Sequence, residues 1–446
     1  MRPDWRSQIL KSPLFIVAIA LLFRIVLVLL LYQVLLNPDE DHFRFGWETG
    51  RVARSVATGK GFSSPYGGET GPTAAQAPLY IYLLAGVFKI FGVYSRPSAL
   101  VISIFDSLFS SLTCWTVSLL ARGMLSATAS LWCAWIWAFL PSACYLSAKS
   151  VWETTLTTFL FSLIVLLAIR IKPSSSLWGQ FGFGGLCGLT ALSSPVVVIV
   201  LPFLLVWPAL RRWPGVRKFL IQDGVTILGL LLILAPWFVR NTQAFHRFVP
   251  FRTNLGLELQ IGNNPIADGT QILAFHPAHN LAEWGEYERM GELGYMAQKK
   301  SEALQFIAKH PGKFALVTMR RVVLFWSEGP TISGGTDLLD TESIEELLGY
   351  GTLSVLAVLG VFLALRSAKD VALLFAIVLL LYPLPYYVTL VHFRYRHLLE
   401  PFLVILAVST LRHIFSRKRA DASLSKQKRL AAGSASPESR IPNCLK

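Results

Sequence analysis

Acidic and basic side chains gather directly after the first long apolar segment of the chain. Asp39, Glu40, Asp41 and Glu48 lie within ten residues of one another, and Arg51 follows them. At helical spacing Asp41 and Glu48 share one face, because seven residues make two turns. A carboxylate can accept the proton of a hydroxyl group, and an arginine fork suits a phosphate. This loop therefore predicts a surface that activates a hydroxyl nucleophile beside the membrane.

Cationic side chains also stand at the ends of other apolar segments. These are Arg240, Arg394, Arg396 and Lys149, with His392 nearby. Each arginine alone is equally compatible with a role as a snorkelling anchor, but three of them opposite an acidic loop favour phosphate binding. Glu153 follows Lys149 by four residues at the start of an apolar segment, where an acid commonly serves the helix dipole.

The composition places these residues in a membrane protein. The chain has 446 residues, of which 53% are hydrophobic and 15% charged, and its mean hydropathy is +0.52. These values exclude an ordinary soluble domain. The formal charge of +15 indicates basic cytoplasmic flanks rather than nucleic-acid binding. The five cysteines include no CxxC pair, so neither a disulfide framework nor a thiolate metal site is predicted.

Ten apolar runs are long enough to be read as membrane spans, since about 20 residues cross a bilayer. They cover residues 13–36, 98–120, 126–147, 154–171, 178–193, 195–210, 219–239, 345–365, 370–389 and 398–415. With this layout the basic loops all face the cytoplasm, as the positive-inside rule requires. Residues 77–92 and 313–327 are shorter and carry charge, which predicts interfacial helices on the outer leaflet.

The spans divide the chain into four parts. Residues 1–239 form a catalytic membrane module with an outer loop at 37–97, and residues 240–344 form an outer insert. The insert is predicted to be mixed, with an extended portion at Leu255–Ile261 and a helix from about Asn280 to Lys309 that His310-Pro311 ends. Residues 345–415 complete the membrane helices. Residues 416–446 are predicted to be a basic, disordered cytoplasmic tail.

Several segments resemble one known superfamily of membrane enzymes. The matching pieces are Asp39 to Phe62, Gln76-Ala77-Pro78-Leu79-Tyr80, Trp152-Glu153, Pro236-Trp237-Phe238-Val239-Arg240-Asn241, and Arg394-Tyr395-Arg396 with Glu400-Pro401. With these pieces the chain resembles the GT-C glycosyltransferases. Within them it is most similar to the bacterial branch that includes protein O-mannosyltransferases and lipid A aminoarabinose transferases. The pieces are spread over nearly the whole chain.

The resemblance implies an all-α polytopic bundle that moves a sugar from a polyprenyl-phosphate donor to an acceptor glycan, lipid or protein. It implies the bacterial inner membrane, with the active site on its periplasmic or outer face, and neither a cofactor nor a metal. The implied catalytic residues are Asp41, Asp39, Glu48 and Glu153, with Asp41 the first choice as base. The implied donor-phosphate ligands are Arg394, Arg396, Arg240 and Lys149. The implied substrate-binding residues are Glu40, His42, Arg51 and His392.

Two other classes of membrane protein share some of these features. A secondary transporter or lipid-linked sugar flippase would use charges inside spans and broken helices, such as Arg24, Asp106 and Ser193-Ser194-Pro195. A polysaccharide polymerase or ligase would share the donor chemistry but take a lipid-linked oligosaccharide. Most charges lie outside the spans, which favours the glycosyltransferase.

The predicted topology places residues 240–344 outside and the C-terminal tail in the cytoplasm. Cysteines introduced at Ser333 and Ser425 are therefore expected to react with a membrane-impermeant thiol reagent from opposite sides of the membrane. The measurement is labelling of intact and permeabilised cells. Labelling of both positions from the same side would contradict the layout.

Overall fold

The computed structural model describes most of the chain as helices. The described residues are 12–35, 45, 47–149, 151–172, 175–211, 213, 215–269, 273–327 and 347–433. Within these ranges no strand occurs, and the one isolated bridge joins Ser63 to Pro72. The predicted all-α class is confirmed.

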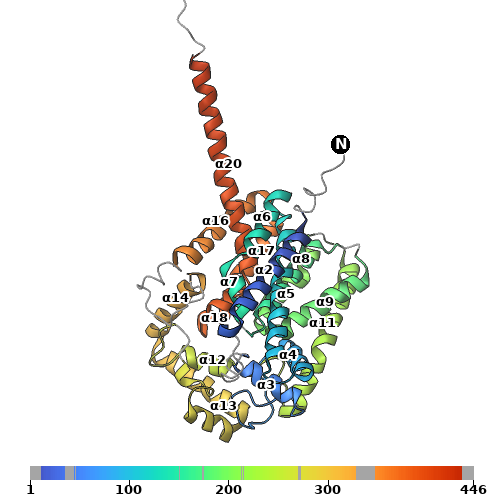
Figure 1. Cartoon of the computed structure of the whole chain (residues 1–446), viewed down its shortest axis with the longest axis vertical. Helices are drawn as coiled ribbons and strands as arrows, with labels where there is room; N and C mark the ends of the chain where they lie inside the picture. Colours follow the sequence, from blue (N-terminus) through green and yellow to red (C-terminus); the bar gives the residue numbers. More distant parts are fainter. Residues whose placement is uncertain are drawn as a thin grey trace, which may run out of the picture.

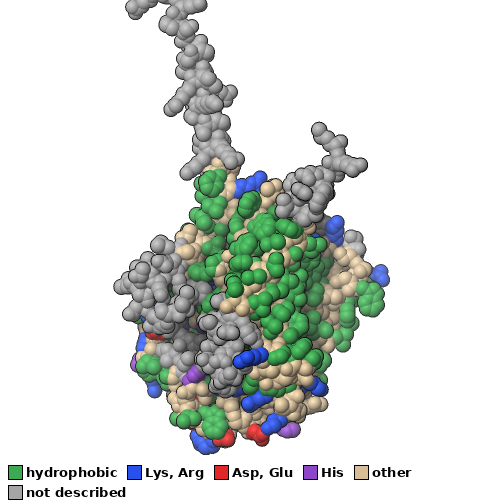
Figure 2. Space-filling view, viewed as in Figure 1, with side chains coloured by type: hydrophobic (Ala, Val, Ile, Leu, Met, Phe, Trp, Pro, Cys, Tyr) green, Lys and Arg blue, Asp and Glu red, His purple; other side chains and the backbone are tan. Residues whose placement is uncertain are grey.

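Apolar helices make up the body of the molecule. They are α2 (Pro13–Leu35), α5 (Arg96–Ala121), α6 (Ala127–Ala138), α7 (Pro141–Lys149), α8 (Thr154–Arg170), α9 (Leu177–Ser193), η2 (Pro195–Ile199), α10 (Leu201–Arg211), α11 (Val216–Phe245), η4 (Leu347–Gly351), α16 (Thr352–Ser367), α17 (Lys369–Leu381) and α20 (Glu400–Gly433). Figure 2 shows hydrophobic side chains covering the middle of one face, with charged groups at its ends. This surface is that of an integral membrane protein.

Five described helices are long and apolar enough to cross a membrane. A sixth span results if α6 and α7, which meet at an angle of 46°, count as one broken span. Each of the ten predicted runs carries helix, but several of these helices are shorter than a span. The number of spans therefore stays a prediction, as does the membrane orientation.

The remaining helices lie at and around one end of the bundle, which we call the insert end. They are α3 (Trp47–Ala57), α4 (Pro78–Phe91), α12 (Leu255–Gly262), η3 (Leu273–Phe275), α13 (Leu281–Lys309), α14 (Pro311–Ser327), α18 (Leu384–Val388) and α19 (Phe393–Arg396). In Figure 1 α3, α12 and α13 lie at the opposite end of the molecule from the projecting part of α20. The helices α4 and α14 coincide with the two stretches predicted to be interfacial.

Arg24 lies inside the bundle, where a lone cation would be costly. Its guanidinium donates to Ser110 Oγ at 3.1 Å and to the carbonyl oxygens of Trp137 and Ala138 at 3.3 and 2.9 Å. Those carbonyls lie at the end of α6, before Pro141 starts α7, and the Trp137 carbonyl also accepts from Leu140 N at 3.3 Å. Arg24 thus donates hydrogen bonds to carbonyl groups at the break between α6 and α7.

Asp106 on α5 is also committed to helix packing. Its carboxylate accepts from the hydroxyls of Tyr80 on α4 and Thr155 on α8, each at 2.8 Å. The residue is 1% exposed. Asp106 therefore joins three helices, and no hydrogen bond pairs it with Arg24.

Two predictions about local structure differ from the observed fold. The portion Leu255–Ile261, predicted to be extended, is helix α12, so that prediction is wrong. Its alternating apolar residues suit a strand, but Leu257 and Ile261 also share a helical face, which packs against Tyr295 and Met296 of α13. The segment from Asn280 to Lys309 is helical as predicted and is capped by Asn280, but Gly291, with φ 70°, breaks α13 into two helices.

The C-terminal segment also differs from its prediction. Disorder was expected over residues 416–446, whereas α20 begins at Glu400 and continues to Gly433. Lys, Arg, Ala, Gln and Leu are strong helix formers, so a helix that begins in the bundle can propagate through them. Figure 1 shows this part of α20 projecting beyond the other helices. Residues 434–446 lie outside the described residues.

Glycines allow the backbones of α9 and α11 to touch where the two helices cross. A Cβ on Gly184 would lie 1.8 Å from the carbonyl oxygen of Thr226, and one on Gly229 would lie 2.2 Å from that of Phe181. Neither position tolerates a side chain without separation of the helices. By contrast, a Cβ on Gly182, on the same helix, would meet nothing within 4 Å.

Gly184→Ala is therefore expected to lower the melting temperature of the detergent-solubilised protein, since overpacking costs about 1–3 kcal/mol. The matched control Gly182→Ala is expected to leave it unchanged or raise it, because alanine is the better helix former. Thermal unfolding by light scattering measures both. Equal melting temperatures of the two variants would contradict the close approach of α9 and α11 at Gly184.

Candidate active site

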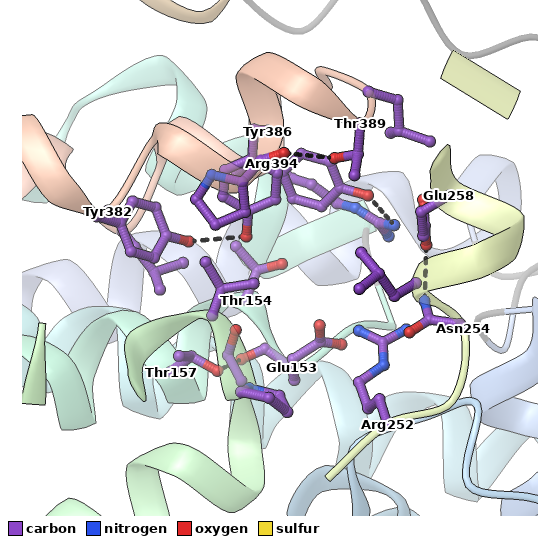
Figure 3. Close-up of a pocket in the computed structure, with 18 of the residues that line it drawn as sticks. Glu153, Thr154, Thr157, Arg252, Asn254, Glu258, Tyr382, Tyr386, Thr389 and Arg394 are labelled. Carbon is purple, nitrogen blue, oxygen red and sulfur yellow. Dashed lines mark hydrogen bonds between the residues drawn. The ribbon is translucent and has the colours of Figure 1, made fainter. Parts of the chain in front are cut away.

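A cavity of about 310 Å³ opens at the insert end, between the start of α8 and the segment that joins α17 to α20. Its polar lining includes Glu153, Thr154, Thr157, Arg252, Asn254, Glu258, Thr389 and Arg394, and its aromatic lining includes Phe251, Tyr382, Tyr386 and Tyr395. Figure 3 shows Glu153 and Arg252 on one side, with Tyr386 and Arg394 on the opposite side. The volume is at the small end of the range for ligand pockets, roughly 300–1,000 Å³.

Glu153 reaches the cavity from the residue that precedes α8. It occupies the N-cap position, and its backbone carbonyl accepts from Thr157 N at 2.8 Å. Its side chain makes no capping hydrogen bond. The carboxylate is therefore not used as a helix cap, and it lines the cavity as a sequence-predicted site residue.

Arg394 lies on α19 and lines the cavity from the other side. Its guanidinium carbon lies 3.9 Å from the centre of the Trp152 ring, a cation–π contact that fixes the plane of the fork. His392 caps α19, because its Nδ1 accepts from Arg394 N at 3.3 Å. Burial, together with the charge of Arg394, lowers the pKa of His392 to about 3. A neutral His392 thus positions Arg394 through the backbone.

The insert supplies two further charged groups that the sequence prediction missed, Arg252 and Glu258. Glu258 on α12 accepts from Asn254 Nδ2 at 2.7 Å. Arg252 donates from Nε to the Ala75 carbonyl at 2.8 Å. They lie six residues apart in a segment predicted to be irregular and extended, so no spacing marked them. The cavity consequently holds carboxylates and guanidiniums from both halves of the chain.

Tyrosines and one close backbone contact build the remaining wall. The rings of Tyr386 and Tyr395 stack with centroids 4.4 Å apart, and the Tyr382 and Tyr386 hydroxyls are 3.2 Å apart. A Cβ on Gly262 of α12 would lie 1.7 Å from the carbonyl oxygen of Thr389. Only glycine therefore lets α12 pack directly on the end of α18, beside Thr389, which lines the cavity.

Glu48 lies on α3 and is 4% exposed. One carboxylate oxygen is 3.2 Å from His276 Nε2. Because His276 Nδ1 accepts from Ala278 N at 3.2 Å, the ring proton is on Nε2 and is donated to Glu48. Burial lowers the pKa of His276 to about 4 and raises the pKa of Glu48. Glu48 does not line the cavity, but it interacts electrostatically with Arg394 and Arg252, which do.

Two of the predicted phosphate ligands have other partners. Arg396 is 1% exposed and donates to Glu400 at 2.9 Å, and it does not line the cavity. Arg240 donates to the carbonyl oxygens of Thr73 and Phe62. Arg396 is buried, and a guanidinium removed from water binds the nearest protein oxygens, whereas Arg240 is half-buried. Neither arginine lines the cavity, and their phosphate role stays a prediction.

The other sequence-predicted residues are only partly described. Arg51 is half-buried beside Glu48, with which it interacts electrostatically. Lys149 is the last residue of α7, and its side chain lies outside the described part. Asp39, Glu40, Asp41 and His42 also lie outside the described residues. Among the residues that are described, no group of three His, Cys, Asp or Glu side chains could hold a metal ion.

Comparison with known proteins places this geometry in a fold. No family model and no curated protein matches the sequence. Among solved structures, the oligosaccharyltransferase AglB from Archaeoglobus fulgidus, in complex with an inhibitory peptide and a dolichol-phosphate, matches with a TM-score of 0.53. The match covers 97% of this chain and 52% of AglB, at 17% identity. The chain has the GT-C fold. The fold class predicted from the sequence is thus confirmed.

Two further matches are to GT-C proteins. AglB tethered to an acceptor peptide with the NVT sequon has 18% identity and a TM-score of 0.53, and the match covers 95% of this chain and 51% of AglB. ArnT from Cupriavidus metallidurans, bound to undecaprenyl phosphate, has 13% identity and a TM-score of 0.38, with 87% and 77% covered. The chain spans about half the length of AglB. At such identities the likeness shows the fold alone.

Proposed function

We propose that this protein is a glycosyltransferase that moves a sugar from a polyprenyl-phosphate donor to an acceptor hydroxyl at the outer face of a bacterial inner membrane. The observation that carries the proposal is the cavity in which Glu153 lies opposite Arg394, in a GT-C fold. Sugar transfer needs carboxylates at the sugar and cations at the leaving phosphate. The cavity combines both at the membrane-helix ends. The acceptor is an unidentified glycan, lipid or protein.

The proposed reaction assigns each charge a role. The acceptor oxygen forms a bond to the anomeric carbon, while the bond from that carbon to the phosphate oxygen breaks and polyprenyl phosphate leaves. Arg394 and Arg252 bind the phosphate, and the stacked contact with Trp152 holds the Arg394 fork in one orientation. Glu153 stabilises the positive charge that develops on the sugar ring.

We assign the base to Asp41 of the first outer loop. Glu48 interacts electrostatically with both cavity arginines, so the chain around it approaches the cavity. Asp41 lies outside the described residues, and seven residues of extended chain, which span at most about 25 Å, would let it reach the same cavity from the position of Glu48. Asp39 and Glu48 are the alternatives. Of these, Glu48 is held by His276, which favours a supporting role.

The transporter alternative loses its main support. Arg24 and Asp106 are the charges inside the spans on which it rests, and both are hydrogen-bonded between helices rather than lining the cavity. The break after Ser193 is present, since α9 ends there and η2 follows. A helix break alone does not distinguish transport from transfer.

Arg394→Lys keeps the charge and loses the planar fork, so affinity for undecaprenyl phosphate is expected to fall about tenfold. Fluorescence titration in detergent measures it. Arg396→Lys serves as the matched control, since Arg396 pairs with Glu400 and is expected to affect melting temperature rather than affinity. Unchanged affinity in the Arg394 variant would indicate that Arg394 is a snorkelling anchor rather than a phosphate ligand.

Asp41→Asn is expected to lower the transfer rate about 100- to 10,000-fold, because a general base contributes that much, while donor binding survives. Glu153→Gln is expected to lower the rate with donor binding likewise retained. The measurement is transfer of labelled sugar from the lipid donor by purified protein. Normal turnover of Asp41→Asn, with Asp39→Asn or Glu48→Gln inactive, would move the base to that residue. If all these variants remain active, the first outer loop does not supply the base.

A further inference from the structure

Arg252, which precedes α12, is held in place by the first outer loop. Its Nε donates to the Ala75 carbonyl at 2.8 Å, and its Nη2 donates to Gln76 Oε1 at 3.3 Å. The backbone of Thr253 runs beside the same loop, since Thr253 N donates to the Ala74 carbonyl at 3.1 Å. The direction of the Arg252 side chain therefore depends on the register between residues 73–76 and 252–253.

One buried carboxylate fixes that register. Glu292 on α13 is 5% exposed, and one of its oxygens accepts from Ala74 N at 2.7 Å and from the Thr253 hydroxyl at 2.6 Å. The other oxygen accepts from the hydroxyls of Thr73 and, at 2.9 Å, of Tyr287. An ionised carboxylate offers about four acceptor sites, and all four are used. Glu292 thus connects the loop, the start of α12 and α13.

We propose that Glu292 is a positioning residue for donor binding, which acts by aligning Arg252 toward the phosphate. Glu292 does not line the cavity, so it contacts no substrate. The inference rests on the proposed function, because it concerns the same donor site. The sequence alone favours a solvated position for Glu292, as for the other acids of the insert helix, but the structure buries it directly after the break in α13 at Gly291.

One substitution changes the hydrogen bonding of Glu292 without changing the size of its side chain. Glu292→Gln keeps the size of the side chain but replaces one acceptor oxygen by an NH₂ donor. The NH₂ group would then face two of the four groups that now donate to the carboxylate, and each hydroxyl among them would have to turn from donor to acceptor. The loop is expected to shift relative to Thr253, and Arg252 is expected to shift with it.

A double-mutant cycle tests this coupling. Binding of undecaprenyl phosphate is measured in detergent for wild type, Glu292→Gln, Arg252→Lys and the double variant, below the melting temperature of each. Each single variant is expected to weaken binding about tenfold, and the double variant is expected to be hardly weaker than either single one. A purely structural role of Glu292 predicts independent effects, which would multiply to about a hundredfold.

The control is Glu283→Gln on the same helix. Glu283 pairs with Lys299 at 2.7 Å and accepts from Tyr295 at 2.7 Å, and among the described residues it makes no hydrogen bond with the loop at 73–76. It is expected to bind the lipid as wild type does. If Glu292→Gln does not fold, Thr253→Val removes one donor to Glu292 and enters the same cycle.

The outcomes separate this inference from the proposed function. A wild-type protein that binds no undecaprenyl phosphate would overturn the proposed function. If Arg252→Lys weakens binding but Glu292→Gln leaves it unchanged, only the positioning role is overturned. Effects of the two substitutions that multiply in the double variant would overturn it too. Binding that Arg252→Lys leaves unchanged would remove Arg252 from the donor site and overturn the inference with it.

Discussion

The cost of burying a polar or charged group without partners governs this structure. Inside the bundle Arg24 is satisfied by the carbonyls of a broken helix, and Asp106 by two hydroxyls from neighbouring helices. Glu400 is 1% exposed and is held by Arg396, His397 and Ser142. Such groups hold helices together, and their hydrogen-bonding capacity is taken up by the protein. Among the described residues, Glu153, Arg252 and Arg394 by contrast line a cavity in which a ligand can contact them.

The same constraint assembles the walls of the cavity. The segment at residues 73–76 has little regular structure, so its backbone groups need partners from elsewhere. Arg240 and Glu292 supply them from α11 and α13, and Arg252 adds a third contact. Gly262 completes the wall, because without a Cβ the backbone of α12 can approach Thr389. The cavity is thus made rigid by groups outside it.

The sequence predicted the membrane helices and several individual site residues, but not how the charges are divided between structure and function. Hydropathy located the helical runs. The position of Glu153 before an apolar helix suggested only a helix-dipole acid, and it was the match of Trp152-Glu153 to the superfamily that singled out this residue, which lines the cavity. Arg394 and Arg396 looked alike in sequence, being two residues apart, yet one lines the cavity and the other pairs with Glu400. Arg252 was missed because tertiary contacts across 177 residues determine where it points. Spacing records local geometry and carries no information about such distant partners.

Native mass spectrometry of the protein purified in mild detergent would test the central claim most directly, because it identifies the lipid that the cavity retains. The account predicts that wild type carries a species with the mass of a polyprenyl phosphate, with or without one sugar, and that Arg394→Lys loses it while Gly182→Ala keeps it. Wild-type protein that retains only bulk phospholipid, even after incubation with excess undecaprenyl phosphate, would contradict the assignment of this cavity to a lipid-phosphate sugar donor.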